Sequence, residues 1–330
     1  MIKIGDQYVN PAICAVGARG FYGEGYPFHR HGWQYLGMDW SGMGFAAKTM
    51  TLLPHRGKGF NEKGNMELRD DGTTPREFSP RCIAVYFLRN GGEVFNAVGL
   101  ASFGLEFYFR SGKLHELDEP FFLSLALDSA DSAGQEAELR DACRLIKTYL
   151  PFRVPVALQL NEGCPNNEHA ICQAAEIICR RVEIAMAILG IPIWVNCNAL
   201  MPTAVLLEVA RIADGLWIGN TIPWRAPETV GRIDWDRYGR ASPIRRRGIA
   251  ADGGLSSHQC LQFTVDKVKD LRDSGCSAQI VAGNGVRDID DFRLLHAAGA
   301  NGAFYGSGAI VRPRGMLERT RFAVNLFSGN

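Results

Sequence analysis

Short apolar runs alternate with longer amphipathic stretches from about residue 120 to the end of the chain. The run at 121–127 (FFLSLAL) is typical of a buried strand, and 131–150 carries apolar residues every three or four positions, which predicts a helix. Alternation of this kind favours a parallel sheet with helices outside it. The remaining predicted strands are 154–161, 191–197, 215–221, 278–285 and 302–308, and the remaining predicted helices are 168–189, 202–213, 287–298 and a terminal helix.

The first third of the chain adds two more strands, at 11–17 and 44–50, which makes eight. Eight parallel strands in one chain predict an α/β fold, a (β/α)8 TIM barrel formed by residues 1–330 as a single domain. Two long segments interrupt the repeat, about 52–95 and 222–252. We expect them to be lid or interface loops over the carboxyl-end face of the barrel, with disordered decoration as the alternative.

Composition narrows the range of functions. The chain has 36 basic and 35 acidic residues, and this balance argues against a nucleic-acid partner. Its nine cysteines form no CxxC pair, as expected for reduced thiols of a cytoplasmic protein. No secretory signal pattern and no apolar run long enough to span a membrane is present, so we expect no membrane anchor. The seven histidines form no i, i+4 pair, and we predict no metal.

Polar residues gather at the predicted strand ends, where barrels carry their active sites. The strand ends bring together a lysine, several amides and two glycine-rich turns, GNG at 283–285 and GSG at 306–308. Two such turns on consecutive strands predict a cradle for phosphate, because backbone N–H groups can point at an anion there. The other residues of this rim are Lys48, Thr49, Asn161, Asn196, Asn220 and Thr221.

Cys164 stands in the segment QLNEGCPN (159–166), beyond the end of a predicted strand. A free cysteine is often a small buried apolar residue, and this is our interpretation of Cys14, Cys172, Cys179 and Cys260. Cys164 differs because it lies in a polar turn before proline, which favours a catalytic role. His29 and His31 lie in an aromatic loop after the first strand, and we interpret them as exposed, with a position at the pocket as the alternative. His169 opens a predicted helix and is interpreted as a surface or capping residue.

These motifs resemble the dihydroorotate dehydrogenase family, in particular its soluble class, over roughly residues 8–310. QLNEGCPN is similar to the family signature Asn-x-x-Cys-Pro-Asn. The other segments that carry the resemblance are KTMTL (48–52), FNAVGL (95–100), GLEFY (104–108), GNT (219–221), DGGLS (252–256), Asn284-Gly285-Val286 and Gly306-Ser307.

The resemblance implies FMN in the barrel mouth and oxidation of dihydroorotate to orotate, with Cys164 as the base at C5 and hydride transfer from C6 to flavin N5. It also implies a homodimer. Amides suit a pyrimidine edge because they both donate and accept. The implied substrate-binding residues are Lys48, Asn96, Gly99, Leu100, Asn161, Asn166, Asn220 and Thr221. The implied FMN-binding residues are Ala15, Gly17, Lys48, Thr49, Asn161, Asn196, Gly254, Asn284, Gly285, Gly306 and Ser307.

One position departs from the family pattern. The family carries a lysine against the flavin at the end of the fifth strand, where this chain has Asn196. Without that cation we expect the flavin to be harder to reduce, by roughly 1–3 kcal/mol. Two alternatives therefore stay open: an FMN-dependent enzyme acting on another cyclic C–C bond, and a non-redox barrel that binds a phosphorylated ligand. The electron acceptor, whether fumarate, oxygen or NAD through a second subunit, is equally open.

Overall fold

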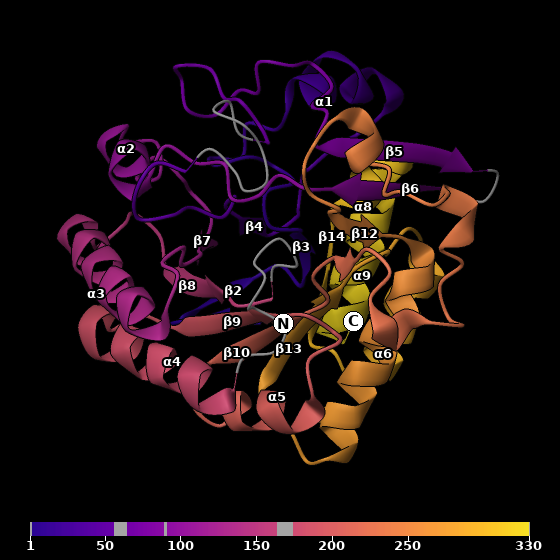
Figure 1. Cartoon of the computed structure of the whole chain (residues 1–330). Coiled ribbons are helices and arrows are strands. Elements are labelled where there is room, and N and C mark those ends of the chain that lie inside the picture. The colour runs from indigo at the N-terminus through magenta and orange to yellow at the C-terminus, as the bar shows by residue number, and fades with distance from the viewer. Residues whose placement is uncertain (1, 56–64, 89–90, 164–173, 330) are drawn as a thin grey trace.

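A computed structural model describes residues 2–55, 65–88, 91–163 and 174–329, and its centre is a barrel of eight parallel strands (Figure 1). The strand order is β3-β14-β13-β10-β9-β8-β7-β4, and a parallel bridge between Ile13 and Gly44 joins its two ends. The prediction of a (β/α)8 barrel is therefore confirmed. The strands are β3 (Ala12–Cys14), β4 (Phe45–Ala46), β7 (Phe121–Leu125), β8 (Val156–Asn161), β9 (Ile193–Cys197), β10 (Gly215–Ile218), β13 (Gln279–Gly283) and β14 (Gly302–Tyr305).

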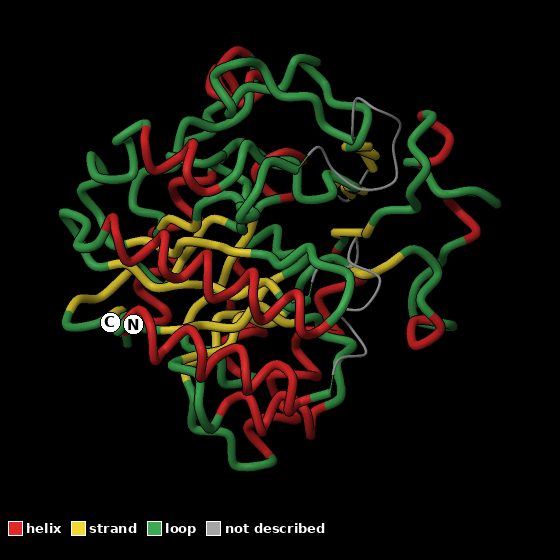
Figure 2. Tube along the Cα trace, turned by 60° about the vertical axis from the view of Figure 1, so that its left-hand side comes forward, coloured by secondary structure: helices red, strands yellow, loops and turns green. Residues whose placement is uncertain are grey.

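Helices surround the barrel and follow its strands, as the alternating pattern predicts (Figure 2). The helix at 258–273 was not predicted. The helices predicted at 131–150, 168–189, 202–213 and 287–298 begin and end within a few residues of those bounds wherever the structure describes them. None of the described helices is both long and apolar enough to cross a membrane. The outer helices are α3 (Ser132–Tyr149), α4 (Ala175–Leu189), α5 (Thr203–Ala210), α6 (His258–Asp273), α7 (Ile289–Ala297) and α9 (Met316–Ser328), and the short α8 (Ser307–Val311) follows β14.

Large aromatic side chains fill the barrel interior. The Phe122 ring lies 5.3 Å from Trp194 and 5.0 Å from Trp217, and Trp217 lies 5.1 Å from Phe304. Gly215 makes room for this layer, because a Cβ there would lie 2.5 Å from the Trp194 ring. A barrel packed in this way leaves space for a ligand only at its mouth.

The two predicted insertions meet over that mouth in one antiparallel sheet of order β11-β12-β6-β5. The first insertion contributes β5 (Ile83–Leu88) and β6 (Gly91–Asn96), and β11 (Ile222–Pro223) and β12 (Gly254–Ser256) flank the second. These parts of the insertions therefore form strands. We call this sheet, together with α1 (Pro27–His31), the cap.

Smaller elements are β1 (Ile2–Ile4), β2 (Gln7–Val9), α2 (Leu105–Arg110) and the 3-10 turns η1 (Trp33–Leu36), η2 (Pro227–Thr229), η3 (Asp236–Tyr238) and η4 (Arg245–Arg247).

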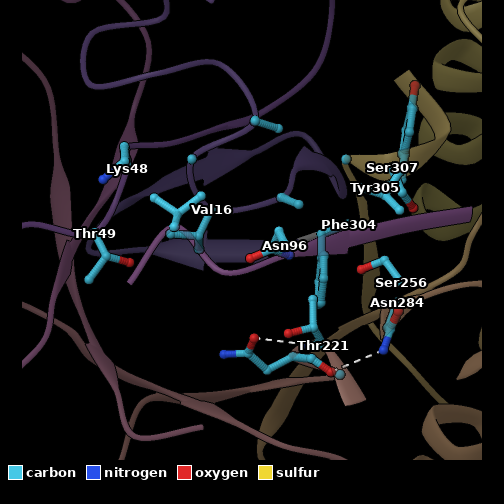
Figure 3. A pocket seen from close by; sticks show the side chains of 18 of the residues that line it. Val16, Lys48, Thr49, Asn96, Thr221, Ser256, Asn284, Phe304, Tyr305 and Ser307 are labelled. Carbon is cyan, nitrogen blue, oxygen red and sulfur yellow. Dashed lines mark hydrogen bonds between the residues drawn. The ribbon is translucent and has the colours of Figure 1, made fainter. Parts of the chain in front are cut away.

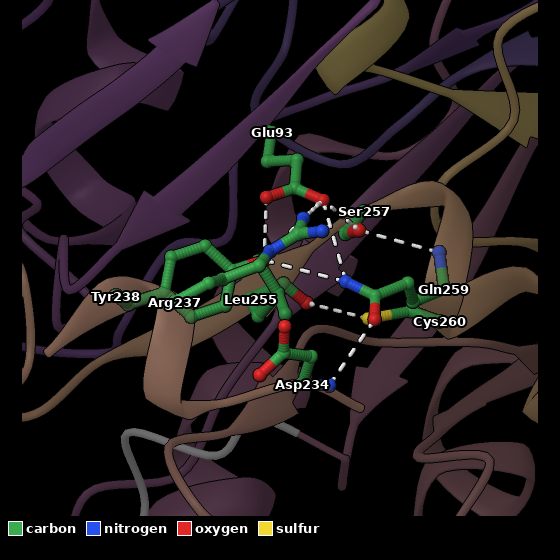
Figure 4. A network of polar contacts seen from close by, with 8 residues as sticks. All are labelled: Glu93, Asp234, Arg237, Tyr238, Leu255, Ser257, Gln259 and Cys260. Carbon is green, nitrogen blue, oxygen red and sulfur yellow. Dashed lines mark hydrogen bonds and ion pairs between the residues drawn. The ribbon is translucent and has the colours of Figure 1, made fainter. Parts of the chain in front are cut away.

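A buried carboxylate, Glu93 on β6, holds the two insertions together (Figure 4). Arg237 and the Tyr238 hydroxyl, both from η3, donate to its two oxygens. The Ser257 hydroxyl, at the start of α6, donates to the same carboxylate at 2.7 Å. Because a buried carboxylate needs donors on both oxygens, these contacts fix β6 against η3 and α6.

The arginine run at 245–247 has exposed side chains, and two of them bond to the cap. Arg246 donates to the Tyr86 hydroxyl at 2.6 Å, and Arg247 donates to the Ile83 carbonyl at 2.5 Å. Both acceptors belong to β5. The run therefore adds further bonds between the two insertions.

We expect Glu93→Ala to lower the free energy of unfolding by about 2–3 kcal/mol, because Arg237 and Tyr238 lose a buried acceptor. Urea unfolding followed by circular dichroism measures this change. Glu106→Ala is the control, because it removes an exposed i, i+4 pair with Arg110 and should change stability by less than about 0.5 kcal/mol. Equal effects of the two substitutions would contradict the role given to Glu93.

Candidate active site

A hollow lies between the carboxyl ends of the barrel strands and the cap, and it contains about 1260 Å³ of space free of protein atoms, including its open mouth. Lys48 and Thr49 lie at one end of it, and Ser256, Asn284 and Ser307 lie at the other (Figure 3). Its size suits a ligand as large as a nucleotide cofactor.

Amide side chains form the floor of the hollow. Asn161 faces Asn196 across the β8–β9 ladder, so both side chains emerge at the same level of the barrel. The Asn161 side-chain oxygen accepts from Asn196 and from Asn220, each at 3.3 Å, and its nitrogen donates to Thr49 at 3.0 Å. Thr49 lies 3.0 Å from the Ser124 hydroxyl. This network fixes the orientation of each amide before any ligand arrives.

Two oxygens at the hollow have no protein partner among the described residues. They are the side-chain carbonyl oxygens of Asn196 and Asn284, both buried. The nitrogen of each is already used, by Asn161 and by the backbone carbonyl of Asn220. A buried acceptor without a donor costs about 1–3 kcal/mol, so a ligand with N–H or O–H groups is the expected partner.

Lys48 brings positive charge to one end of the hollow. Its side chain is almost fully buried, and its ammonium group donates to the Ala101 carbonyl and lies 4.8 Å from the centre of the Phe21 ring. Of the lining residues that the structure describes, Lys48 alone is a lysine or arginine. An anionic group of a ligand would therefore be attracted to this end.

The turns at the ends of β13 and β14 lie side by side, as predicted for a phosphate cradle. Tight packing around both turns requires glycine, because a Cβ on Gly285 would lie 1.9 Å from the Ser257 carbonyl oxygen and one on Gly306 would lie 2.8 Å from the Ala15 Cβ. Asn284 itself has a left-handed backbone with φ of 86°. Leu100, on the other side of the hollow, is left-handed too, with φ of 66°. Strain of this kind is concentrated at functional sites.

Asp291 holds the turn that follows β13. Its carboxylate accepts from the backbone N–H of Arg287 at 2.7 Å and of Asp288 at 3.2 Å, and it pairs with His258 at 3.3 Å. Burial by itself raises the pKa of Asp291, but the bonds from His258 and from these N–H groups outweigh it and hold the pKa below its usual range. Asp291 therefore holds the turn in its ionised form, as the acceptor of these bonds.

Nearly all of the predicted site residues that the structure describes line the hollow. Gly254 does not line it, whereas Ser256, two residues further along β12, does. Cys164 and Asn166 lie outside the described residues, as do Cys172 and His169. The predicted residues that line the hollow are Ala15, Gly17, Lys48, Thr49, Asn96, Gly99, Leu100, Asn161, Asn196, Asn220, Thr221, Asn284, Gly285, Gly306 and Ser307.

The remaining cysteine predictions divide in two. Cys14 and Cys260 are buried, and burial raises the pKa of Cys14 to about 11 and that of Cys260 to about 12, which fits their assignment as packing residues. Cys179 on α4 is only partly buried, so the assignment as a buried packing residue holds for it only in part.

Sequence reasoning assigned Asn96 of the cap to the site, but it missed the other cap residues that line the hollow, among them Ile83, Val94 and Ser256. His29 was interpreted as exposed, and the structure buries it in the wall of the hollow beside Tyr26, whereas His31 is exposed as expected. No periodicity marks a helix as short as α1, so the pattern could not indicate which of its residues face inward. The clustering of aromatic residues at 21–40 was the one signal that this loop packs against something.

No protein-family model and no curated protein sequence matches the chain. Among solved structures, the chain is similar to a dihydroorotate dehydrogenase (DHODH) from Eimeria tenella in complex with ferulenol, with a TM-score of 0.62 and 16% identity over 95% of this chain and 80% of that one. It is also similar to the ligand-free DHODH of the same organism, with a TM-score of 0.58 and 15% identity over 86% of this chain and 78% of that one. The chain therefore has a DHODH-like fold.

We expect Asp291→Asn to lower the free energy of unfolding by about 1–2 kcal/mol at pH 7. The folded pKa of Asp291 is depressed, so its contribution is complete above the unfolded pKa of about 3.9 and is lost as the pH falls through the folded value. The difference from wild type should therefore shrink below about pH 4 in urea unfolding. Asp290→Asn, at an exposed neighbour, is the control. A difference that stays constant down to pH 3 would contradict this account.

Proposed function

We propose that this protein is an FMN-dependent oxidoreductase that oxidises dihydroorotate to orotate. The observation that carries the proposal is the hollow itself, in which oriented amides, one buried lysine and two tightly packed glycine turns share one end of a DHODH-like barrel. The residues present fit a flavin nucleotide for two reasons. The buried side-chain oxygens of Asn196 and Asn284 have no donor among the described residues, and the two glycine turns form a cradle that a Cβ would fill.

In this proposal the two glycine turns hold the phosphate of FMN through backbone N–H groups. Ser307 and Ser256 are the hydroxyl-bearing side chains at that end of the hollow. Asn284 and Asn196 present side-chain oxygens to N–H or O–H groups of the cofactor. When bound, FMN supplies the hydride acceptor that no amino-acid side chain can provide.

The substrate end of the hollow is assigned to Lys48, Asn96, Asn220 and Thr221. The amides match the alternating N–H and C=O edge of a pyrimidine, and Lys48 and the strained turn at Gly99-Leu100 suit its carboxylate. Asn220 is held in place because its side-chain oxygen accepts from the Thr221 N–H at 2.8 Å. An amide held in one orientation discriminates between substrates that differ in one hydrogen-bonding group.

Cys164 is proposed as the base that removes the C5 proton. The support is its sequence, QLNEGCPN, and the half-buried floor residue Asn161 three positions before it, which lies at the end of β8. A thiol with an ordinary pKa of about 8.5 needs its thiolate stabilised to act as a base near neutral pH. In this proposal Lys48, the cation at the substrate end of the hollow, supplies the charge that stabilises the thiolate.

A second candidate keeps the flavin and changes the substrate to another cyclic C–C bond. Asn196 favours it, because the amide nitrogen there is used by Asn161 and only a neutral acceptor remains where related enzymes carry a cation. A third candidate is a barrel that binds a phosphorylated ligand without redox chemistry.

We expect the purified protein to bind FMN and turn yellow, and dihydroorotate to bleach it under anaerobic conditions. Cys164→Ala should keep the colour and slow bleaching by about 10²–10⁴-fold, the usual contribution of a general base. Cys179→Ala, on the outer helix α4, is the control and should bleach normally. Yellow protein that dihydroorotate does not bleach would favour the second candidate, and protein that takes up no FMN would favour the third.

We expect Asn196→Lys to raise the midpoint potential of bound FMN by about 20–60 mV, since roughly 1–3 kcal/mol of charge stabilisation corresponds to that range for two electrons. The measurement is a redox titration against a reference dye. Asn196→Met is the matched control, because it removes the same bond to Asn161 without adding charge. Equal potentials in the two variants would show that charge at this position does not matter.

A further inference from the structure

The cap side of the hollow is mainly apolar, in contrast to the amide floor. It is lined by aliphatic and aromatic side chains from three different segments, with one imidazole, His29, among them. These apolar lining residues are Tyr26, Ile83, Val94, Val98, Leu100 and Ile310. Besides Asn96 and Ser256 at the ends of cap strands, His29 adds a polar group to this surface, and a few polar groups of this kind fix what an apolar surface can bind.

The protonation state of His29 follows from its contacts. Its Nδ1 accepts from the backbone N–H of Tyr26 at 3.4 Å, so a neutral ring carries its proton on Nε2. Burial lowers the pKa of His29 to about 3, which makes the ring neutral at pH 7. The ring is therefore a hydrogen-bond donor through Nε2.

That Nε2 has no acceptor. His29 is only 2% exposed, and no described residue accepts a hydrogen bond from its Nε2. The ring is otherwise well packed, 4.3 Å from Phe28, 5.6 Å from Trp40 and 5.8 Å from Tyr26 between ring centres. Leaving such a donor buried and unpaired costs about 1–3 kcal/mol, and a phenylalanine would fill the same space without that cost. Because His29 lines the hollow, a ligand bound there can supply the acceptor for its Nε2–H.

The position of α1 indicates which part of a ligand would meet His29. The Trp33 indole N–H donates to the carbonyl of Ile310 on α8, and the Phe28 and Trp33 rings lie 6.1 Å apart. These contacts hold α1 close to α8, the helix that starts at Ser307 in the second glycine turn (Figure 1). His29 therefore belongs to the glycine-turn end of the hollow.

We propose that His29 is a ligand-binding residue whose Nε2–H donates to an oxygen of the ribityl-phosphate half of the flavin nucleotide. This inference rests on the proposed function and adds a contact from the cap, so that the nucleotide is held from above as well as by the two glycine turns. His29 makes the empty protein less stable than it need be and is satisfied only when the ligand is bound.

The test compares apo-protein carrying His29→Phe with wild type. Phenylalanine keeps the ring contacts and removes the donor, so FMN affinity, measured by quenching of flavin fluorescence, should fall about tenfold, as expected for one hydrogen bond. The melting temperature of the apo-protein should stay the same or rise. A residue with a merely structural role would lower the melting temperature instead. His29→Gln, which keeps an N–H donor, should recover part of the affinity, and it serves as the second variant.

His31→Phe is the matched control, because His31 lies on the same short helix and is exposed. It should leave FMN affinity unchanged. Unchanged FMN affinity in His29→Phe, or a lower apo melting temperature with no recovery in His29→Gln, would overturn the assignment of His29 while leaving the proposed function intact. Wild-type protein that binds no FMN would overturn both.

Discussion

The register between neighbouring barrel strands is the constraint on which the candidate site depends. Asn161 stands opposite Asn196, and Asn196 stands opposite Trp217, across two successive ladders. Because side chains alternate along a strand, a slip of one residue in either ladder would turn an amide away from the mouth. The aromatic layer beneath holds the register, since Trp194 and Trp217 both pack against Phe122 and could not do so after a slip. The apolar core and the polar floor therefore determine each other.

The cap depends on a second kind of contact. Its strands come from segments separated by more than a hundred residues, and they lie over a mouth that must stay open to a ligand. The buried carboxylate of Glu93 joins β6 to η3 and to Ser257, the residue that caps the start of α6. The Ser257 carbonyl lies against the Gly285 turn, so the same contacts extend to the predicted phosphate cradle. The roof and the floor of the hollow are thus connected through a short chain of polar contacts.

The hollow contains features that oppose folding. Two amide oxygens and one imidazole N–H that line it are buried and find no partner among the described residues. Two of the three described non-glycine residues with positive φ, Leu100 and Asn284, line it as well. A bound ligand can offset the cost of the polar groups without partners.

The sequence by itself determined the barrel and most of its rim. Short continuous apolar runs and helical runs of period 3.6 are local signals, and eight of the former, mostly in alternation with the latter, leave few other folds. Strand ends follow from strand positions, so Asn161, Asn196 and the two glycine turns could be assigned to one face before any coordinates. Only the tertiary structure decided the cap. The pairing of β6 with β12, the burial of Glu93 and the inward position of His29 depend on contacts between distant segments. A short, irregular segment carries no periodicity to reveal such contacts, because its burial is set by its partners and not by its own pattern.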